Sequence, residues 1–135
     1  MTENREAVAQ TYTDYFQAFQ NLDPEAVLPY YHLPCLFLSS HGVLLVTSAA
    51  EGRGLFAELM RGLKARSYAR SEWGKLGVKQ LSDHAALLST SVVRYKTDGT
   101  ELEQFGATYT FRKTDAGWKI AVVVVHDFDT ILELT

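Results

Sequence analysis

The sequence predicts an α+β fold in which three helices come first and an antiparallel sheet follows. Apolar residues recur at a spacing of three and four up to about residue 65, which is the period of a helix, and at a spacing of two afterwards, which is the period of a strand. Short turns join the later strands, so consecutive strands are expected to pair antiparallel. We therefore predict that the helices cover one face of the sheet.

The first two helices are predicted from an aromatic stripe and from a helix start signal. Over residues 3–21 the apolar side chains share one helical face, which consists of Val8, Tyr12, Tyr15, Phe16 and Phe19. Asp23 is a typical N-cap and Pro24 suits the first helical position, so a short second helix is expected to run to about Tyr31. Pro34 stops helix formation after it.

A small hairpin and a third helix come next. Residues 35–39 and 43–47 are predicted to be two short strands joined by a turn at residues 40–42. Thr47 or Ser48 then caps a helix over residues 49–65. The apolar face of this helix consists of Leu55, Phe56, Leu59, Met60 and Leu63.

Four long strands complete the chain, and they are expected over residues 68–82, 85–97, 101–113 and 118–128. The third of them alternates, with Phe105, Ala107, Tyr109 and Phe111 on one face. The last is apolar on both faces from Trp118 to Val125, so we expect it to be a central strand that is covered on two sides. It ends in the polar pair His126-Asp127.

Composition limits the classes of function. A length of 135 residues fits a single domain over residues 1–135, and a formal net charge of -3 gives no electrostatic reason to expect nucleic acid. No apolar run approaches the length of a membrane span, and the first residues lack the features of a signal peptide, so no membrane partner and a cytoplasmic location are expected. The single cysteine, Cys35, lies in an apolar run and is expected to be a buried thiol.

The order of elements resembles the NTF2-like superfamily, in particular its SnoaL-like branch. The features that carry the resemblance are the aromatic first helix running into Gln20-Asn21-Leu22-Asp23-Pro24-Glu25, the passage from Tyr30-Tyr31 to Pro34, and Tyr109-Thr110-Phe111-Arg112-Lys113 followed by Gly117-Trp118-Lys119-Ile120. The resemblance implies a strongly bent sheet that forms a cone with a central apolar pocket, and a homodimer through the outer face of the sheet. It does not fix the function, because the superfamily includes isomerases, dehydratases, cyclases and transport factors.

Ketosteroid isomerisation is one activity that the resemblance suggests. That family uses a tyrosine of the first helix, an acidic base near the first small strand and a protonated aspartate on the penultimate long strand. Tyr15 stands where the tyrosine is expected, but the base position falls in Ser39-Ser40 and the aspartate position falls near Ala107. Neither the serines at the base position nor the alanine at the aspartate position can exchange a proton at a tuned pKa, so we reject this mechanism for the chain.

His126 and Asp127 are the candidate catalytic residues, because dehydratases of this fold use histidines, a tyrosine pair and an acid around a pocket. Adjacent strand residues point to opposite faces, so only one of the two can enter the pocket unless a bulge intervenes. Alternation alone does not decide which of the two enters it, but the small Ala121 shares the face of Asp127 and indicates a crowded side, so we favour His126. A histidine there can accept or donate a proton near neutral pH. The alternative is a histidine that is hydrogen-bonded at a strand end or at a dimer contact.

Further side chains are expected to line the pocket, and most of them are aromatic: Tyr12, Tyr15, Phe16, Phe19, Tyr31, His32, Phe37, Phe56, Trp73, Tyr95 and Tyr109. Simple core packing stays open for the aromatic residues of the first helix, packing on the third helix for Trp73, and a structural role for His32. No cofactor is expected, and no metal, because no pair of histidines with an acid has ligand spacing.

Two functions follow from these expectations. The first is a small-molecule binding protein, or a cofactor-independent lyase or isomerase of the SnoaL-like kind, whose apolar, tyrosine-rich pocket takes a neutral ring-containing or acyl ligand. The second is a non-catalytic, homodimeric interaction or scaffold protein, whose cone is filled by its own side chains. A cavity of about 300 Å³ or more would favour the first function.

Overall fold

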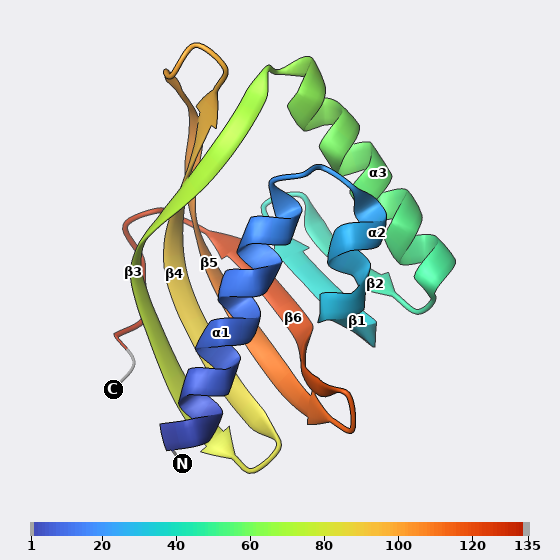
Figure 1. The fold of residues 1–135 in the computed structure, drawn as a ribbon, viewed down its shortest axis with the longest axis vertical. Coiled ribbons are helices and arrows are strands. Elements are labelled where there is room, and N and C mark those ends of the chain that lie inside the picture. The colour runs from blue at the N-terminus through green and yellow to red at the C-terminus, as the bar shows by residue number, and fades with distance from the viewer. Residues whose placement is uncertain (1, 134–135) are drawn as a thin grey trace.

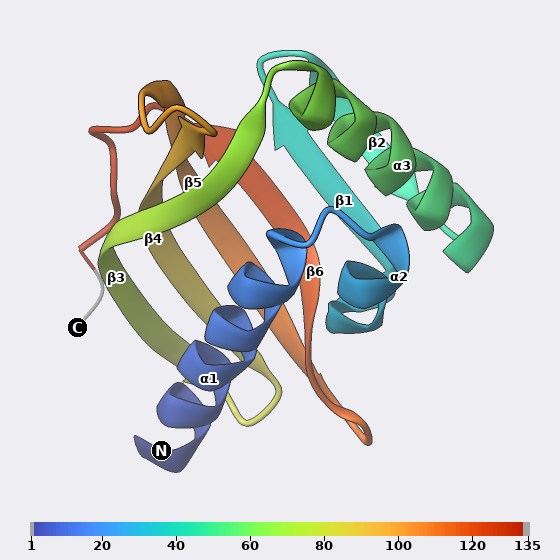
Figure 2. The same ribbon diagram turned by 45° about the horizontal axis from the view of Figure 1, so that its top comes forward.

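The computed structural model describes residues 2–133, and it confirms the predicted α+β class. The elements are α1 (Thr2–Phe19), α2 (Pro24–Val27), a 3-10 turn η1 (Leu28–Tyr30), β1 (Tyr31–Ser39), β2 (Gly42–Val46), α3 (Ala49–Ala65), β3 (Tyr68–Ser82), β4 (Ala85–Lys96), β5 (Glu101–Thr114) and β6 (Gly117–His126). The six strands form one sheet in the order β2-β1-β6-β5-β4-β3. This sheet is strongly bent but not closed, and the helices lie on its concave side (Figures 1 and 2).

The strand pairing departs from a purely antiparallel sheet at one place. Strands β3 to β6 form the predicted antiparallel meander, but β1 pairs with β6 in the parallel sense, with Phe37 opposite Val123. Strand β6 therefore has a hydrogen-bonded neighbour on each side, which agrees with its apolar, β-branched composition. A register shift between Trp73 and Leu76 accompanies the bend of β3 that Figure 1 shows.

The helix starts follow the predicted capping signals. The Asp23 carboxylate accepts a hydrogen bond from the amide of Glu25 at 3.0 Å. Ser48 is the cap of α3, since its hydroxyl accepts from the amide of Glu51 at 3.2 Å, and the Glu51 carboxylate accepts in return from the amide of Thr47 at 2.7 Å. Helix α2 is shorter than expected and ends at Val27.

The passage from α2 to β1 also differs from the expected boundaries. Residues 28–30 form the 3-10 turn, and β1 begins at Tyr31 rather than at Cys35. Pro29 lacks an amide hydrogen, so it cannot continue the hydrogen-bonding pattern of α2. The earlier start of β1 brings Tyr31 opposite Ile120 of β6.

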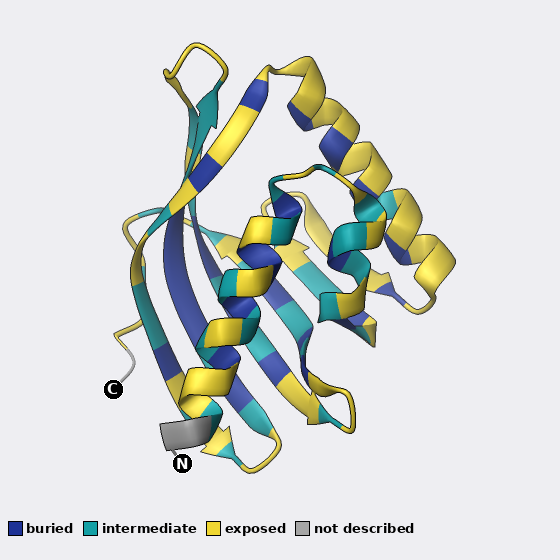
Figure 3. Cartoon of the chain, in the orientation of Figure 1, coloured by how far each residue is buried: buried dark blue, intermediate teal, exposed yellow. Residues whose placement is uncertain are grey.

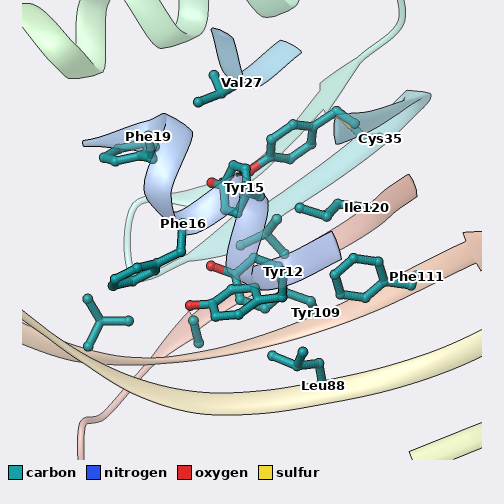
Figure 4. Packing of buried hydrophobic residues seen from close by; sticks show 14 of the residues in the cluster. Tyr12, Tyr15, Phe16, Phe19, Val27, Cys35, Leu88, Tyr109, Phe111 and Ile120 are labelled. Carbon is teal, nitrogen blue, oxygen red and sulfur yellow. Dashed lines mark hydrogen bonds between the residues drawn. The ribbon is translucent and has the colours of Figure 1, made fainter. Parts of the chain in front are cut away.

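The core is the contact between the aromatic face of α1 and the concave face of the sheet. Figure 3 shows the buried stripe of α1 turned toward the sheet, and Figure 4 shows Tyr12 of α1 beside Tyr109 of β5. The Tyr12 side chain is completely buried, with ring-centroid distances of 5.2 Å to Tyr109 and 5.6 Å to Trp73. Trp73 also packs edge-on against Phe16 at 4.9 Å, so this tryptophan packs on α1.

The opposite, convex face of the sheet is only partly covered. Thr108 pairs with Val124 and Thr110 with Val122, and all four side chains are partly exposed there. Homodimerisation through this face stays a prediction. No helix in the described residues 2–133 is long and apolar enough to cross a lipid bilayer.

Candidate functional site

A cavity of about 530 Å³ lies between α3, the C-terminal half of α1 and the concave face of the sheet. Its buried walls are formed by Tyr15, Phe19, Tyr31, Phe56, Leu63, Tyr109 and Val123. Exposed residues lie at its mouth, namely His41, Glu58, Leu59, Gly62, Arg66, Gln104 and Val125. Such a volume lies within the range of about 300–1,000 Å³ that is usual for small-molecule sites.

A pair of tyrosine hydroxyls forms part of the buried wall. The hydroxyls of Tyr15 and Tyr31 are hydrogen-bonded at 2.7 Å, and one of the two donates to the other. Burial raises the pKa of Tyr15 to about 12, although the hydrogen bond with Tyr31 and the charge of Arg94 lower it. Burial also raises the pKa of Tyr31 well above its ordinary value. Both phenols are therefore neutral at physiological pH, and their pair retains one hydroxyl hydrogen for another acceptor.

An arginine and a glutamate face each other across β4 and β5 on the same side of the sheet as this pair. Arg94 donates from Nη1 to Oε2 of Glu103 at 2.6 Å, and Oε1 of Glu103 lies 2.9 Å from Nη2 of Arg66. One carboxylate thus lies between two guanidinium groups. Burial opposes the ionisation of Glu103, but the hydrogen bond from Arg94 and the charges of both arginines outweigh it and lower the pKa of this carboxyl.

The Arg94 guanidinium is held among aromatic rings. Its side chain is 14% exposed, and its central carbon lies 4.7 Å from the ring centre of Phe105 and 5.3 Å from that of Phe19. The Nε atom is buried and has no hydrogen-bond partner in the described part of the chain. Arg94 also lines a small adjoining cavity of about 30 Å³, where Tyr12 and Phe16 are among its neighbours.

The structure brings more than half of the expected pocket residues to the wall of the main cavity: Tyr15, Phe19, Tyr31, Phe37, Phe56 and Tyr109. His32, Trp73 and Tyr95 lie elsewhere. The Nδ1 atom of His32 is 2.9 Å from the carbonyl oxygen of Pro34. The Tyr95 ring lies under the guanidinium of Arg70 at 4.2 Å.

The expectation that His126 faces the pocket is corrected by a bulge in β6. Thr110 pairs with Val122 but Phe111 pairs with Ile120, so Ala121 is an extra residue and the two faces of the strand exchange there. Ile120 and Val123 are consequently both buried on the concave side, although their numbers differ in parity. His126 points to the convex face. Asp127 follows the end of β6, is exposed and does not line the cavity either.

His126 is hydrogen-bonded through both ring nitrogens. Its Nδ1 lies 3.0 Å from the carbonyl oxygen of Asp127, and its Nε2 lies 2.8 Å from the hydroxyl of Thr108. In the neutral ring, Nδ1–H donates to the carbonyl and the Thr108 hydroxyl donates to Nε2. The ring lies against Gly106, where an added Cβ would come within 2.6 Å of Nδ1, so a glycine is required at this contact. This is the arrangement of a hydrogen-bonded histidine at a strand end.

Sequence reasoning missed the charged wall of the cavity. Glu103 has the same parity as Phe105 and Tyr109, and Arg94 has the same parity as Leu88 and Val92. The available signal was that Arg94 continues the buried face of β4, Glu103 continues that of β5, and the two strands are neighbours. Arg66 belongs to a group of basic residues at the end of α3, and because a positive charge there also favours the helix dipole, its sequence position does not show that it faces the cavity.

A larger hollow of about 760 Å³ lies between the bend of β3 and the residues after β6, where Gly74, Leu76, Phe128 and Leu132 are among its lining residues. Of the residues that the structure describes, Phe128 is the single aromatic one in its lining, and the hollow has no paired buried hydroxyls, so we centre the candidate site on the 530 Å³ cavity. Within residues 2–133, no cluster of three His, Cys, Asp or Glu side chains is placed to hold a metal ion.

Comparison with known proteins identifies the family and the fold. Residues 4–128 match a family model described as NTF2-like protein (DUF6841). The chain is similar to a domain of unknown function with a cystatin-like fold from Nostoc punctiforme, with a TM-score of 0.77, 16% identity and coverage of 96% of this chain and 80% of that chain. It is similar to an NTF2-like protein with a cystatin-like fold from Novosphingobium aromaticivorans, with a TM-score of 0.77, 20% identity and coverage of 95% and 84%.

A third solved structure, a ketosteroid isomerase-like protein from Erwinia carotovora atroseptica, has a TM-score of 0.74 and 14% identity, and the match covers 96% of this chain and all (100%) of that chain. At these identities the likeness shows the fold alone. No curated protein sequence matches the chain significantly.

Glu103→Gln is expected to destabilise the fold at neutral pH by about 1–2 kcal/mol, because two arginines lose their shared counter-ion. The folded-state pKa of Glu103 is lowered from 4.5, so its contribution to stability is present above pH 4.5 and is lost as the pH falls through the lowered value. Urea unfolding of both proteins at a series of pH values measures this difference. Glu72→Gln, which removes an exposed partner of Arg70, serves as the control and is expected to change stability little. A Glu103→Gln difference that does not shrink in acid would contradict this interpretation.

Proposed function

The chain belongs to the NTF2-like family described as DUF6841, and from this premise we propose that it binds a small, largely apolar molecule with a ring or an acyl chain. The observation that carries the proposal is the 530 Å³ cavity on the concave side of the sheet. A cavity with apolar walls and a few polar groups is the usual form of a small-molecule site. Its volume supports ligand binding over the alternative of a scaffold protein whose cone is filled by its own side chains.

The aromatic walls suit a flat or extended apolar body. The Phe56 ring lies at right angles to Phe37, with a centroid distance of 6.0 Å, and tilted against Tyr31 at 5.0 Å. Rings in such tilted arrangements present both faces and edges, which favours contact with another ring or with an acyl chain. The Tyr15–Tyr31 pair supplies a hydroxyl donor that can orient one oxygen atom of the ligand.

Acid–base catalysis is the second candidate function, and the same tyrosine pair is the observation that favours it. A buried phenol can donate a hydrogen bond to a developing negative charge. Two pKa shifts weigh against proton transfer as the main role: burial raises that of Tyr15 to about 12, and the neighbouring arginines keep Glu103 ionised. General acids and bases work best with a pKa near the operating pH, so binding has the stronger support.

A substitution that fills the cavity is expected to block binding. Val125 lines the cavity, whereas the preceding residue, Val124, faces the convex side of the same strand. Val125→Trp should therefore weaken the binding of the neutral naphthalene dye prodan by about tenfold or more, because the indole occupies space that the ligand needs. Val124→Trp is the matched control and should leave the affinity within about twofold. Fluorescence titration measures both, and equal effects of the two substitutions would contradict the proposed binding site.

Substitution of His126 tests whether the convex face of the sheet contributes to ligand binding or only to stability. His126→Ala is expected to leave prodan affinity within about twofold of wild type, because the histidine lies outside the cavity. It should lower the midpoint of thermal unfolding, because the hydrogen bonds to Thr108 and to the Asp127 carbonyl are lost. A large loss of prodan affinity with unchanged unfolding would restore His126 to the site.

A further inference from the structure

We propose that the ligand of the 530 Å³ cavity is an organic monoacid, whose carboxylate pairs with Arg94 while its ring or acyl body lies against the aromatic walls. This inference rests on the proposed function and adds the charge of the ligand to it. Its basis is a guanidinium that lines the cavity and is itself largely buried. A buried charge is costly, so its position and its partners indicate what the site is built to receive.

The position of Arg94 is fixed before any ligand enters. Phe19 and Phe105 contact the guanidinium, and Glu103 holds its Nη1 atom. An arginine that is already held among rings loses little conformational freedom when a ligand binds to it. The planar fork of its N–H groups matches the two oxygens of a carboxylate.

The charges around the cavity leave an excess of one positive charge beside the aromatic walls. Glu103 accepts from both Arg94 and Arg66, so this cluster of three groups contains two cations and one anion. The other acid at the cavity, Glu58, is exposed at the mouth and pairs with Arg61 on the surface of α3. A group with one negative charge therefore balances the cluster.

A monoanion fits this balance better than a dianion. A phosphate monoester would bring about two negative charges at neutral pH and leave one of them unpaired among the apolar walls. A neutral ligand would leave the excess charge of the cluster unchanged. The carboxylate is also the size of group that leaves most of the 530 Å³ for the apolar body.

Two probe ligands of nearly the same shape test directly whether the site prefers a negatively charged ligand. 2-Naphthoate and 2-naphthamide share one ring system and differ in the charge of a single substituent. At pH 7, isothermal titration of the wild-type chain should show the acid binding about tenfold or more tightly than the amide, because only the acid brings a negative charge and two acceptor oxygens to the Arg94 guanidinium.

Substitutions test whether the preference for the acid depends on the cluster of Arg94, Glu103 and Arg66. Arg94→Gln should bring the ratio of acid affinity to amide affinity close to one. Glu103→Gln should increase acid affinity about threefold or more, since it removes a competing carboxylate, and a damaged fold cannot produce such a gain. Arg70→Gln is the matched control, because Arg70 stacks on Tyr95 away from the cavity, and it should preserve the preference.

The outcomes distinguish this inference from the proposed function on which it rests. Tighter binding of the acid that disappears in Arg94→Gln supports both. Equal binding of acid and amide by the wild-type chain overturns the monoacid inference and leaves the apolar binding function standing. No binding of either probe, or of prodan, overturns the proposed function and the inference together.

Discussion

The contact between α1 and the concave face of the sheet is the constraint on which the rest of the structure depends. Tyr12 is fully buried there, and its ring packs against Tyr109 at 5.2 Å and Trp73 at 5.6 Å. Because α1 ends at Phe19, it covers only part of the concave face. Helix α3 covers the remainder from the side of β1 and β2, and the 530 Å³ cavity lies between these two helices and the sheet.

The cavity combines apolar walls with a charged cluster, and the two depend on each other. The aromatic rings of Phe19 and Phe105 hold the Arg94 guanidinium, and Glu103 supplies a counter-ion that reduces the cost of its burial. Burial raises the pKa of Tyr15, whereas the hydrogen bonds and charges of Arg94 and Arg66 outweigh burial and lower the pKa of Glu103. These shifts keep one group ionised and the other neutral, which gives the site fixed hydrogen-bond donors and a fixed charge.

The sequence was sufficient for the class of the fold, because that depends on periodicity and local signals. The change from helical to strand spacing near residue 65, the cap formed by Asp23 and the alternation along β5 all appear in the structure. The aromatic half of the site was predictable for the same reason, since Tyr15, Phe19 and Tyr109 follow from these periods.

The remainder of the site depends on pairings between distant segments. The parallel pairing of β1 with β6 is decided by the packing of the whole sheet, and no turn in the sequence specifies it. The bulge at Ala121 exchanges the faces of β6, so Ile120 and Val123 share the concave side and His126 lies on the convex side, which no count of residues along the strand could predict. The ion pair of Arg94 and Glu103 follows from the register between two strands, and that register could not be derived from the composition of either strand.

The central claim is that Arg94 receives a carboxylate inside the aromatic cavity. A crystal structure of the chain with 2-naphthoate tests it most directly. The claim predicts a carboxylate oxygen within about 3 Å of an Arg94 nitrogen and the naphthalene ring among Tyr31, Phe37 and Phe56. A naphthoate in the hollow between β3 and the residues after β6, or a carboxylate turned out to solvent with Arg94 bound to Glu103 alone, would contradict it.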